Sequence, residues 1–158
     1  MEAEQQYRVV LGVIGADCHA VGNKILHAFL SENGIAVINL GVMVSQDEFV
    51  QAAIEQNAQA ILVSSIYGHG EIDCQGFRDL CEKQGLYNII LYVGGNLVIG
   101  KQDFSDVVQQ FTDMGFDRVF QPSTDLQEVV GLLREDVDRR RETLIGHNSS
   151  AAGELQAA

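Results

Sequence analysis

The segment YRVVLGVIGADCHAVGNKIL, residues 7–26, decides the fold. Its first half is a nearly continuous apolar run from Val9 to Ile14, which is typical of a strand covered on both faces of a sheet. Its second half begins a helical pattern of apolar residues over 25–30, and Asn33-Gly34 is a typical signal for the end of such a helix. A strand that leads directly into a helix is the repeating unit of α/β proteins.

The same unit recurs along the chain. Further apolar runs follow at 36–40, 60–66, 89–93 and 118–120, and segments with helical spacing separate them. We predict these helices to begin after Ser45 and to cover about 76–84, 103–114 and 126–141. Strict alternation implies a parallel sheet with right-handed crossovers and helices on both faces. Five strands favour a doubly wound, flavodoxin-like (Rossmann-like) sheet in the order 2-1-3-4-5.

The composition is that of one globular domain, since 46% of the 158 residues are apolar and 20% are charged. We expect this domain to span residues 1–142. Residues 143–158 are small, polar and aperiodic, which predicts a disordered tail. No apolar run approaches the roughly 20 residues that cross a bilayer, and the acidic start MEAEQQYR differs from a signal peptide. We therefore expect a cytoplasmic protein without a membrane partner.

Charge and cysteine content argue against a nucleic-acid-binding protein and against one built on disulfides or a zinc site. A net charge of −12 would repel phosphate backbones, so nucleic acid is not an expected partner. The three cysteines, Cys18, Cys74 and Cys81, are odd in number and show no C-x-x-C spacing. This pattern favours reduced thiols over a disulfide framework or a zinc site.

Three loops should line one crevice, because ligands of open parallel sheets bind outside the carboxyl ends of the strands near the switch in strand order. In the order 2-1-3-4-5, strands one, three and four are neighbours. The loops that follow them are ADCHAVG at 16–22, SSIYGHG at 64–70 and GGNLVIG at 94–100. All three are rich in glycine and small residues, which lets a ligand approach the backbone.

The first loop places a carboxylate two residues from a histidine. Asp17 can accept the Nδ1 proton of His19, which leaves Nε2 free as a base or a metal ligand. Asp17 is also suited to cap the following helix, with His19 a solvated loop residue. In the second loop Ser64 and Ile66 share one face and Ser65 faces the other way. Two serines also suit the end of a buried strand, so each pattern alone leaves two interpretations open.

The third loop has the spacing of a phosphate-binding loop but not its chemistry. Gly95, Gly100 and Lys101 fit the G-x-x-x-x-G-K pattern, whereas Gln102 replaces the Ser or Thr that would bind magnesium. The apolar residues within this loop suit a flat apolar ligand better than a phosphate.

Together the three loops resemble those of cobalamin-binding domains, whose pattern is D-x-H-x-x-G, then S-x-L, then G-G. The matching residues are Asp17, His19 and Gly22, then Ser64 and Ile66 with isoleucine in place of leucine, then Gly94 and Gly95. Longer runs are similar to the small (sigma) subunits of glutamate mutase, or methylaspartate mutase. They are DCHAVGNKIL at 17–26, GEIDC at 70–74, VGGN at 93–96 and MGFDRV at 114–119.

This resemblance implies adenosylcobalamin as the cofactor. His19 would replace the cofactor's own dimethylbenzimidazole as the lower axial cobalt ligand, with Asp17 behind it. The displaced nucleotide tail would then enter the core through the crevice. The residues implied to contact the cofactor are Ala16, Asp17, Cys18, His19, Ala20, Gly22, Ser64, Ser65, Ile66, Gly94, Gly95, Asn96, Leu97, Val98, Ile99 and Gly100.

The resemblance also implies a radical reaction, started by cobalt–carbon homolysis, that isomerises L-glutamate to threo-3-methyl-L-aspartate in glutamate degradation. A dicarboxylate substrate needs cationic clamps, usually arginines. Arg8, Arg78 and Arg118 are predicted to lie away from the crevice, so the chain offers no catalytic residue. We therefore expect a larger barrel-type subunit to carry the glutamate site in a heterotetramer, with this chain inactive alone.

Three alternatives remain at this point. A corrinoid carrier for methyl transfer shares the motif, although such carriers usually place a helical bundle first and only six residues precede strand one here. The cobalamin subunit of another mutase is the second alternative. A phosphoaccepting receiver module is the third, but it carries its acceptor aspartate at the end of strand three, where this chain has Ser64 and Ser65.

Overall fold

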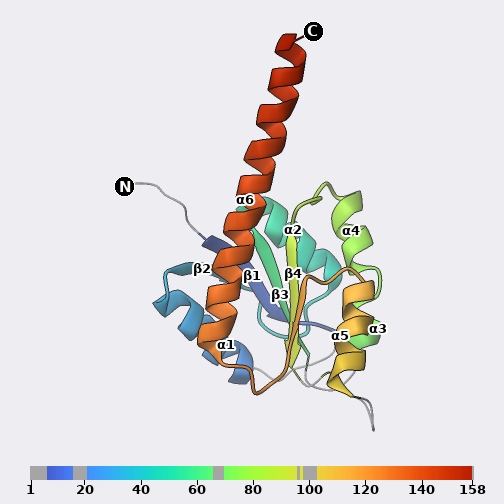
Figure 1. Ribbon diagram of the computed structural model, residues 1–158. Coiled ribbons are helices and arrows are strands. Elements are labelled where there is room, and N and C mark those ends of the chain that lie inside the picture. The colour runs from blue at the N-terminus through green and yellow to red at the C-terminus, as the bar shows by residue number, and fades with distance from the viewer. Residues whose placement is uncertain (1–6, 16–20, 66–69, 96, 98–102, 158) are drawn as a thin grey trace.

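Five parallel strands form one sheet in the computed structural model, which describes residues 7–15, 21–65, 70–95, 97 and 103–157 (Figure 1). The strands are β1 (Tyr7–Val13), β2 (Ile35–Asn39), β3 (Ala60–Ser65), β4 (Ile90–Gly95) and β5 (Arg118–Phe120). The helices are α1 (Val21–Glu32), α2 (Gln46–Gln56), α3 (Gly70–Cys74), α4 (Phe77–Lys83), α5 (Phe104–Asp113) and α6 (Leu126–Ala157).

The strand order is β2-β1-β3-β4-β5, which confirms the predicted flavodoxin-like sheet. β1 lies inside the sheet, where Val9 pairs with Val37 of β2 and with Ala60 of β3. Its residues alternate between two cores, because Val9 packs on one face of the sheet and Val10 on the other. Both faces are buried, and this explains the nearly continuous apolar run in the sequence.

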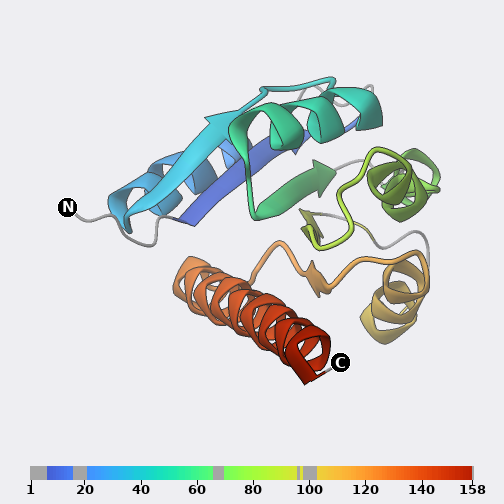
Figure 2. The ribbon, with the colours of Figure 1, turned by 90° about the horizontal axis from the view of Figure 1, so that it is seen from above.

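Two layers of helices produce these two cores (Figure 2). On one face α1 and α6 contribute Leu30 and Leu133, which are fully buried against the sheet. On the other face α2, α4 and α5 bury aromatic side chains, and the rings of Phe49 and Phe77 lie 5.7 Å apart. Burial of each such side chain contributes about 1.5–3 kcal/mol, so both layers hold the sheet firmly.

The ends of the helices follow the local sequence signals. Ser45 caps α2 by accepting a hydrogen bond from the Glu48 amide, and the Glu48 side chain accepts one from the Ser45 amide in return. α1 ends at Glu32, and Gly34 follows it with a φ of +81°. The short helix α3 was not predicted, because its five residues are too few to show a helical period.

The C-terminal segment differs from its prediction. We expected residues 143–158 to be disordered, whereas α6 continues as a helix to Ala157 and projects beyond the amino ends of the strands (Figure 1). Extending an existing helix costs far less than nucleating one, so small and polar residues need not end it. None of the helices in the described part of the chain is long and apolar enough to span a membrane.

Candidate functional site

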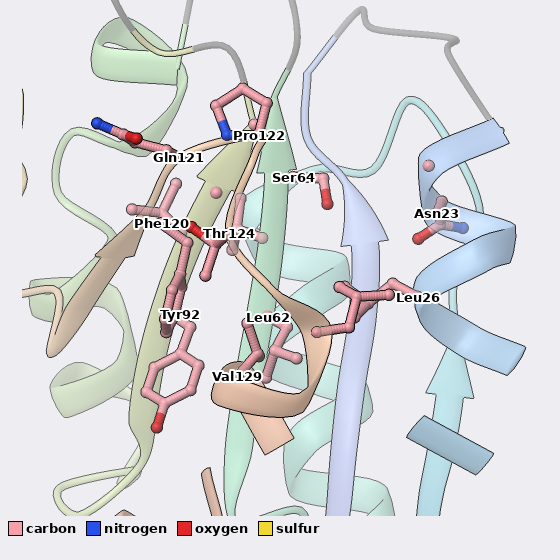
Figure 3. A pocket seen from close by; sticks show the side chains of 16 residues that line it. Asn23, Leu26, Leu62, Ser64, Tyr92, Phe120, Gln121, Pro122, Thr124 and Val129 are labelled. Atoms are coloured by element: carbon pink, nitrogen blue, oxygen red, sulfur yellow. The ribbon is translucent and has the colours of Figure 1, made fainter. Parts of the chain in front are cut away.

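A pocket of about 340 Å³ opens at the carboxyl edge of β3 and β4, on the face of the sheet covered by α1 and α6 (Figure 3). The first turns of α1 form one wall, and the connection between β5 and α6 forms the opposite wall. Its lining residues are Gly22, Asn23, Leu26, Leu62, Val63, Ser64, Tyr92, Val93, Gly94, Gly95, Phe120, Gln121, Pro122, Thr124, Leu126 and Val129. Its position is the one that ligands of open parallel sheets occupy.

Strand geometry explains which residues face the pocket. Leu62 and Tyr92 belong to the core beneath α1 and α6, and Ser64 and Gly94 follow two positions later on the same strands. Because side chains alternate with a period of two, all four positions share one face of the sheet. Larger apolar side chains thus form the floor, while the hydroxyl and the glycine lie nearer the open edge.

Four of the predicted cofactor-contacting residues line this pocket, namely Gly22, Ser64, Gly94 and Gly95. Ser65 is 1% exposed and does not line it, as its position on the opposite face requires. Leu97 was expected along the pocket but is instead packed in the core on the α2, α4 and α5 side. The apolar side chain of Leu97, which follows β4, therefore contributes to the core.

The remaining predicted residues lie outside the residues that the structure describes. They are Ala16, Asp17, Cys18, His19, Ala20, Ile66, Asn96, Val98, Ile99 and Gly100. Within the described ranges, no three His, Cys, Asp or Glu side chains gather at one place as metal ligands would.

Sequence reasoning missed the wall formed by the β5–α6 connection. Gln121, Pro122 and Thr124 lie there and are among the lining residues of the pocket (Figure 3). The signal was available, because β5 was predicted beside β4 and its carboxyl end must then reach the same edge of the sheet. Asn23 was missed for another reason, since a polar residue near a helix start is usually expected to face solvent.

The two adjacent glycines of β4 have different structural roles. Gly95 has a φ of +110°, and a Cβ there would lie 2.0 Å from the Ser65 carbonyl oxygen. A Cβ on Gly94 would make only ordinary contacts, the nearest at 3.5 Å from the Phe120 Cβ. The backbone therefore requires glycine at 95, whereas glycine at 94 leaves open space in the pocket.

Tyr92 at the pocket floor is fixed by a charged pair. Its hydroxyl donates to Asp136 Oδ2 at 2.5 Å, and Arg118 donates to both oxygens of the same carboxylate at 2.7 and 3.0 Å. Burial and the hydrogen bond to Asp136 raise the pKa of Tyr92 above its ordinary value, so the phenol stays neutral. The ring meets Phe120 edge to face at 5.2 Å, which fixes the shape of the apolar floor.

Few polar atoms face this apolar floor. The Ser64 hydroxyl and the Asn23 amide oxygen point toward the interior from opposite sides in Figure 3. Asn23 is 4% exposed, and its Oδ1 has no hydrogen-bond partner in the described part of the chain. An apolar pocket of this size with a few converging polar groups suits a flat organic group that carries a hydrogen-bond donor.

Comparison with known proteins gives the site a context. Residues 7–130 match the B12 binding domain family. The chain is 61% identical to a glutamate mutase sigma subunit of Escherichia coli O157:H7 over 134 residues, which cover 85% of this chain and 90% of that protein.

Solved structures share the fold at lower identity. A cobalamin-binding protein from Desulfitobacterium hafniense DCB-2 superposes with a TM-score of 0.67 at 20% identity, over 84% of this chain and 60% of that one. The signal receiver domain of the putative response regulator NarL from Mycobacterium tuberculosis has a TM-score of 0.63 at 16% identity, over 85% of this chain and 98% of that one. Since one fold serves both kinds of protein, the function must be argued from the site.

Proposed function

This chain belongs to the B12 binding domain family and to its glutamate mutase sigma subunits, and from that premise we propose that it carries adenosylcobalamin for a glutamate mutase. The observation that carries the proposal is the apolar pocket at the carboxyl edge of β3 and β4. A pocket of about 340 Å³ is too small for the corrin ring but is suited to the nucleotide tail.

The described residues fit such a tail. Leu62, Tyr92 and Val129 form the apolar floor, against which a dimethylbenzimidazole ring can pack. Gly94 leaves room beside the strand, and Ser64 offers a hydroxyl opposite it. The unpartnered Asn23 oxygen is a further sign that the pocket is completed by a ligand.

We assign the lower axial cobalt ligand to His19, on the basis of the D-x-H-x-x-G motif. Asp17 would accept a hydrogen bond from the other ring nitrogen, which fixes the tautomer and raises the basicity of the ligand. When bound, adenosylcobalamin supplies a cobalt–carbon bond whose homolysis provides the radical for the conversion of L-glutamate to threo-3-methyl-L-aspartate. The chain's own contribution is to hold the cofactor in the base-off form and to keep its tail out of solvent.

The substrate site belongs to another subunit in this proposal. The guanidinium of Arg78 donates to Gly115 O at 3.0 Å, to Ile89 O at 2.8 Å and to the Asp117 carboxylate. Arg118 is paired with Asp136, and Arg8 donates to a backbone carbonyl of α2. These three arginines hold the fold together, so they do not serve as clamps for a dicarboxylate.

The surface around the crevice suits a partner. Four large apolar side chains are more than half exposed in segments that follow the carboxyl ends of strands, namely Val21, Ile25, Met43 and Ile72. Exposed apolar groups rimmed by polar ones are typical of protein interfaces. We propose a larger barrel-type subunit that covers the crevice in a heterotetramer, and we expect this chain to be inactive without it.

Spectroscopy on the purified chain tests the axial ligand. Hydroxocobalamin should show a visible spectral change on binding, and H19A should abolish it while H147A, a histidine in the tail, should not. In the cob(II)alamin state, ¹⁵N-histidine labelling should convert the nitrogen splitting from a triplet to a doublet. An unchanged splitting would assign the lower ligand to another group and reject the role of His19.

An activity assay tests the division of labour. The chain alone should leave glutamate unchanged with adenosylcobalamin, and addition of the large subunit of a glutamate mutase should restore the isomerisation. Conversion by the isolated chain would contradict the proposal. Methyl transfer from methylcobalamin without isomerase activity would favour the corrinoid carrier instead.

A further inference from the structure

Asn23 presents a hydrogen-bond acceptor to the pocket. It is the third residue of α1, it is 4% exposed, and its side chain lies on the pocket wall opposite Ser64 (Figure 3). Its Nδ2 donates to Asn39 Oδ1 at 2.8 Å, while its Oδ1 has no partner within the described residues. A buried polar atom without a partner calls for an explanation.

The neighbouring hydrogen bonds fix which atom of Asn23 faces the pocket. The Gly41 backbone amide lies 2.8 Å from Asn39 Oδ1 and can only donate, so this Asn39 atom must be the oxygen. An oxygen at 2.8 Å from the Asn23 amide requires a donor there, which is Nδ2. The Asn23 oxygen is therefore turned to the pocket, and exchanging the two amide atoms would break the bond to Asn39.

An acceptor in this position selects among ligands. Without a ligand, Asn23 Oδ1 is buried and lacks a hydrogen-bond partner among the described residues. A ligand that brings a donor to this atom gains a hydrogen bond that a ligand without a donor lacks, and this difference corresponds to roughly tenfold in affinity. The preferred ligand thus combines an apolar ring with an adjacent O–H or N–H group.

The two parts of the nucleotide tail differ in this respect. N-linked dimethylbenzimidazole has no N–H or O–H group, so it fits the apolar floor formed by Leu62, Tyr92 and Val129 but cannot satisfy Asn23. The ribose attached to it carries free hydroxyl groups. With the base on the floor, the sugar is the part of the tail that lies toward the polar edge, where Asn23 and Ser64 are found.

We propose that Asn23 Oδ1 accepts a hydrogen bond from a ribose hydroxyl of the cofactor's nucleotide tail. Asn23 is held in place by its hydrogen bond to Asn39 Oδ1, to which the Gly41 amide also donates. This inference rests on the proposed function. It makes Asn23 a specificity-determining residue that discriminates corrinoids with a ribosyl tail from those without one.

Calorimetric titration of the full chain with cobalamin and with cobinamide, which lacks the nucleotide, tests the proposal. N23L should weaken cobalamin binding about tenfold and change cobinamide binding less than twofold. N88L, the same exchange at an exposed asparagine that does not line the pocket, should preserve the wild-type ratio of the two affinities. Equal losses for both corrinoids, or no loss for cobalamin, would overturn the assignment.

A change on the ligand side keeps the test valid if N23L fails to fold. Cobalamin whose free ribose hydroxyls are replaced by hydrogen should bind the wild-type chain about tenfold more weakly than cobalamin does. Equal affinity of the wild-type chain for both compounds would overturn the hydrogen bond. Failure of the proposed function looks different, because the wild-type chain would then bind neither cobalamin nor cobinamide.

Discussion

Ser64 of β3 lies directly opposite Gly94 of β4 in the parallel sheet, and both line the pocket. The next pair along these strands, Ser65 and Gly95, differs in kind, because Gly95 approaches the Ser65 backbone so closely that no side chain fits. Glycine at 94 therefore leaves space in the pocket, whereas glycine at 95 is required by the backbone. Substitutions at the two positions should separate binding from stability.

Gly94→Ala should impair cofactor binding without unfolding the protein. The added methyl group makes only ordinary contacts with Phe120, so the free energy of unfolding should change by less than about 1 kcal/mol. It projects into the space assigned to the nucleotide tail, where overpacking costs about 1–3 kcal/mol. Calorimetric titration should show cobalamin affinity reduced about tenfold. Unchanged affinity would mean that the tail binds elsewhere.

Gly95→Ala should destabilise the fold itself. Its φ of +110° is unfavourable for alanine, and the new methyl group would overlap the Ser65 carbonyl. We expect the free energy of unfolding in urea to fall by about 2–3 kcal/mol or more, with Gly94→Ala as the matched control. Equal stability of the two variants would contradict the difference between these glycines.

The fold could be predicted because buried parallel strands leave a clear trace in sequence. The run from Val9 to Ile14 is apolar at successive positions since both faces of β1 are covered, and the alternation of strands and helices then restricts the topology. The period of two places Ser64 and Ser65 on opposite faces of the sheet, and Ser64 lines the pocket whereas Ser65, also expected to contact the cofactor, does not.

The pocket was only partly predictable, since it depends on contacts between distant segments. In sequence, Asn23 is a polar residue near a helix start, for which an exposed position is expected. Its hydrogen bond to Asn39, sixteen positions away, shows that its side chain points inward. Leu97 was predicted from sequence to line the pocket, whereas in the structure it packs beneath α2, α4 and α5. Local pattern identifies the strand ends that approach a ligand but not which side chains are used for packing.

The Asp136 cluster should make stability depend on acid pH. Burial alone would raise the pKa of Asp136, but the hydrogen bonds from Arg118 and Tyr92 outweigh it and hold that pKa below its ordinary value. The carboxylate therefore stabilises the fold above its unfolded pKa of about 3.9, and this contribution is lost as pH falls through the lower folded pKa. In urea titrations, the stability difference between wild type and Asp136→Asn should be constant above about pH 5 and shrink below about pH 4. A difference independent of pH would contradict this.

Cys74 and Cys81 should be unreactive in the folded protein. Burial, aided at Cys74 by the Asp73 carboxylate, raises the pKa of Cys74 to about 12, and burial raises that of Cys81 to about 11. Since the thiolate is the nucleophile, iodoacetamide at pH 8 should modify neither residue until urea unfolds the chain, as mapped by mass spectrometry.

The raised pKa values of the two thiols in the folded chain also make stability depend on alkaline pH. The stabilising contribution of the neutral thiols is complete below the unfolded thiol pKa of about 8.5 and declines as pH rises through the folded values. The free energy of unfolding should therefore decrease above about pH 9. In the labelling experiment, rapid modification of either thiol in the native chain would show instead that this core opens.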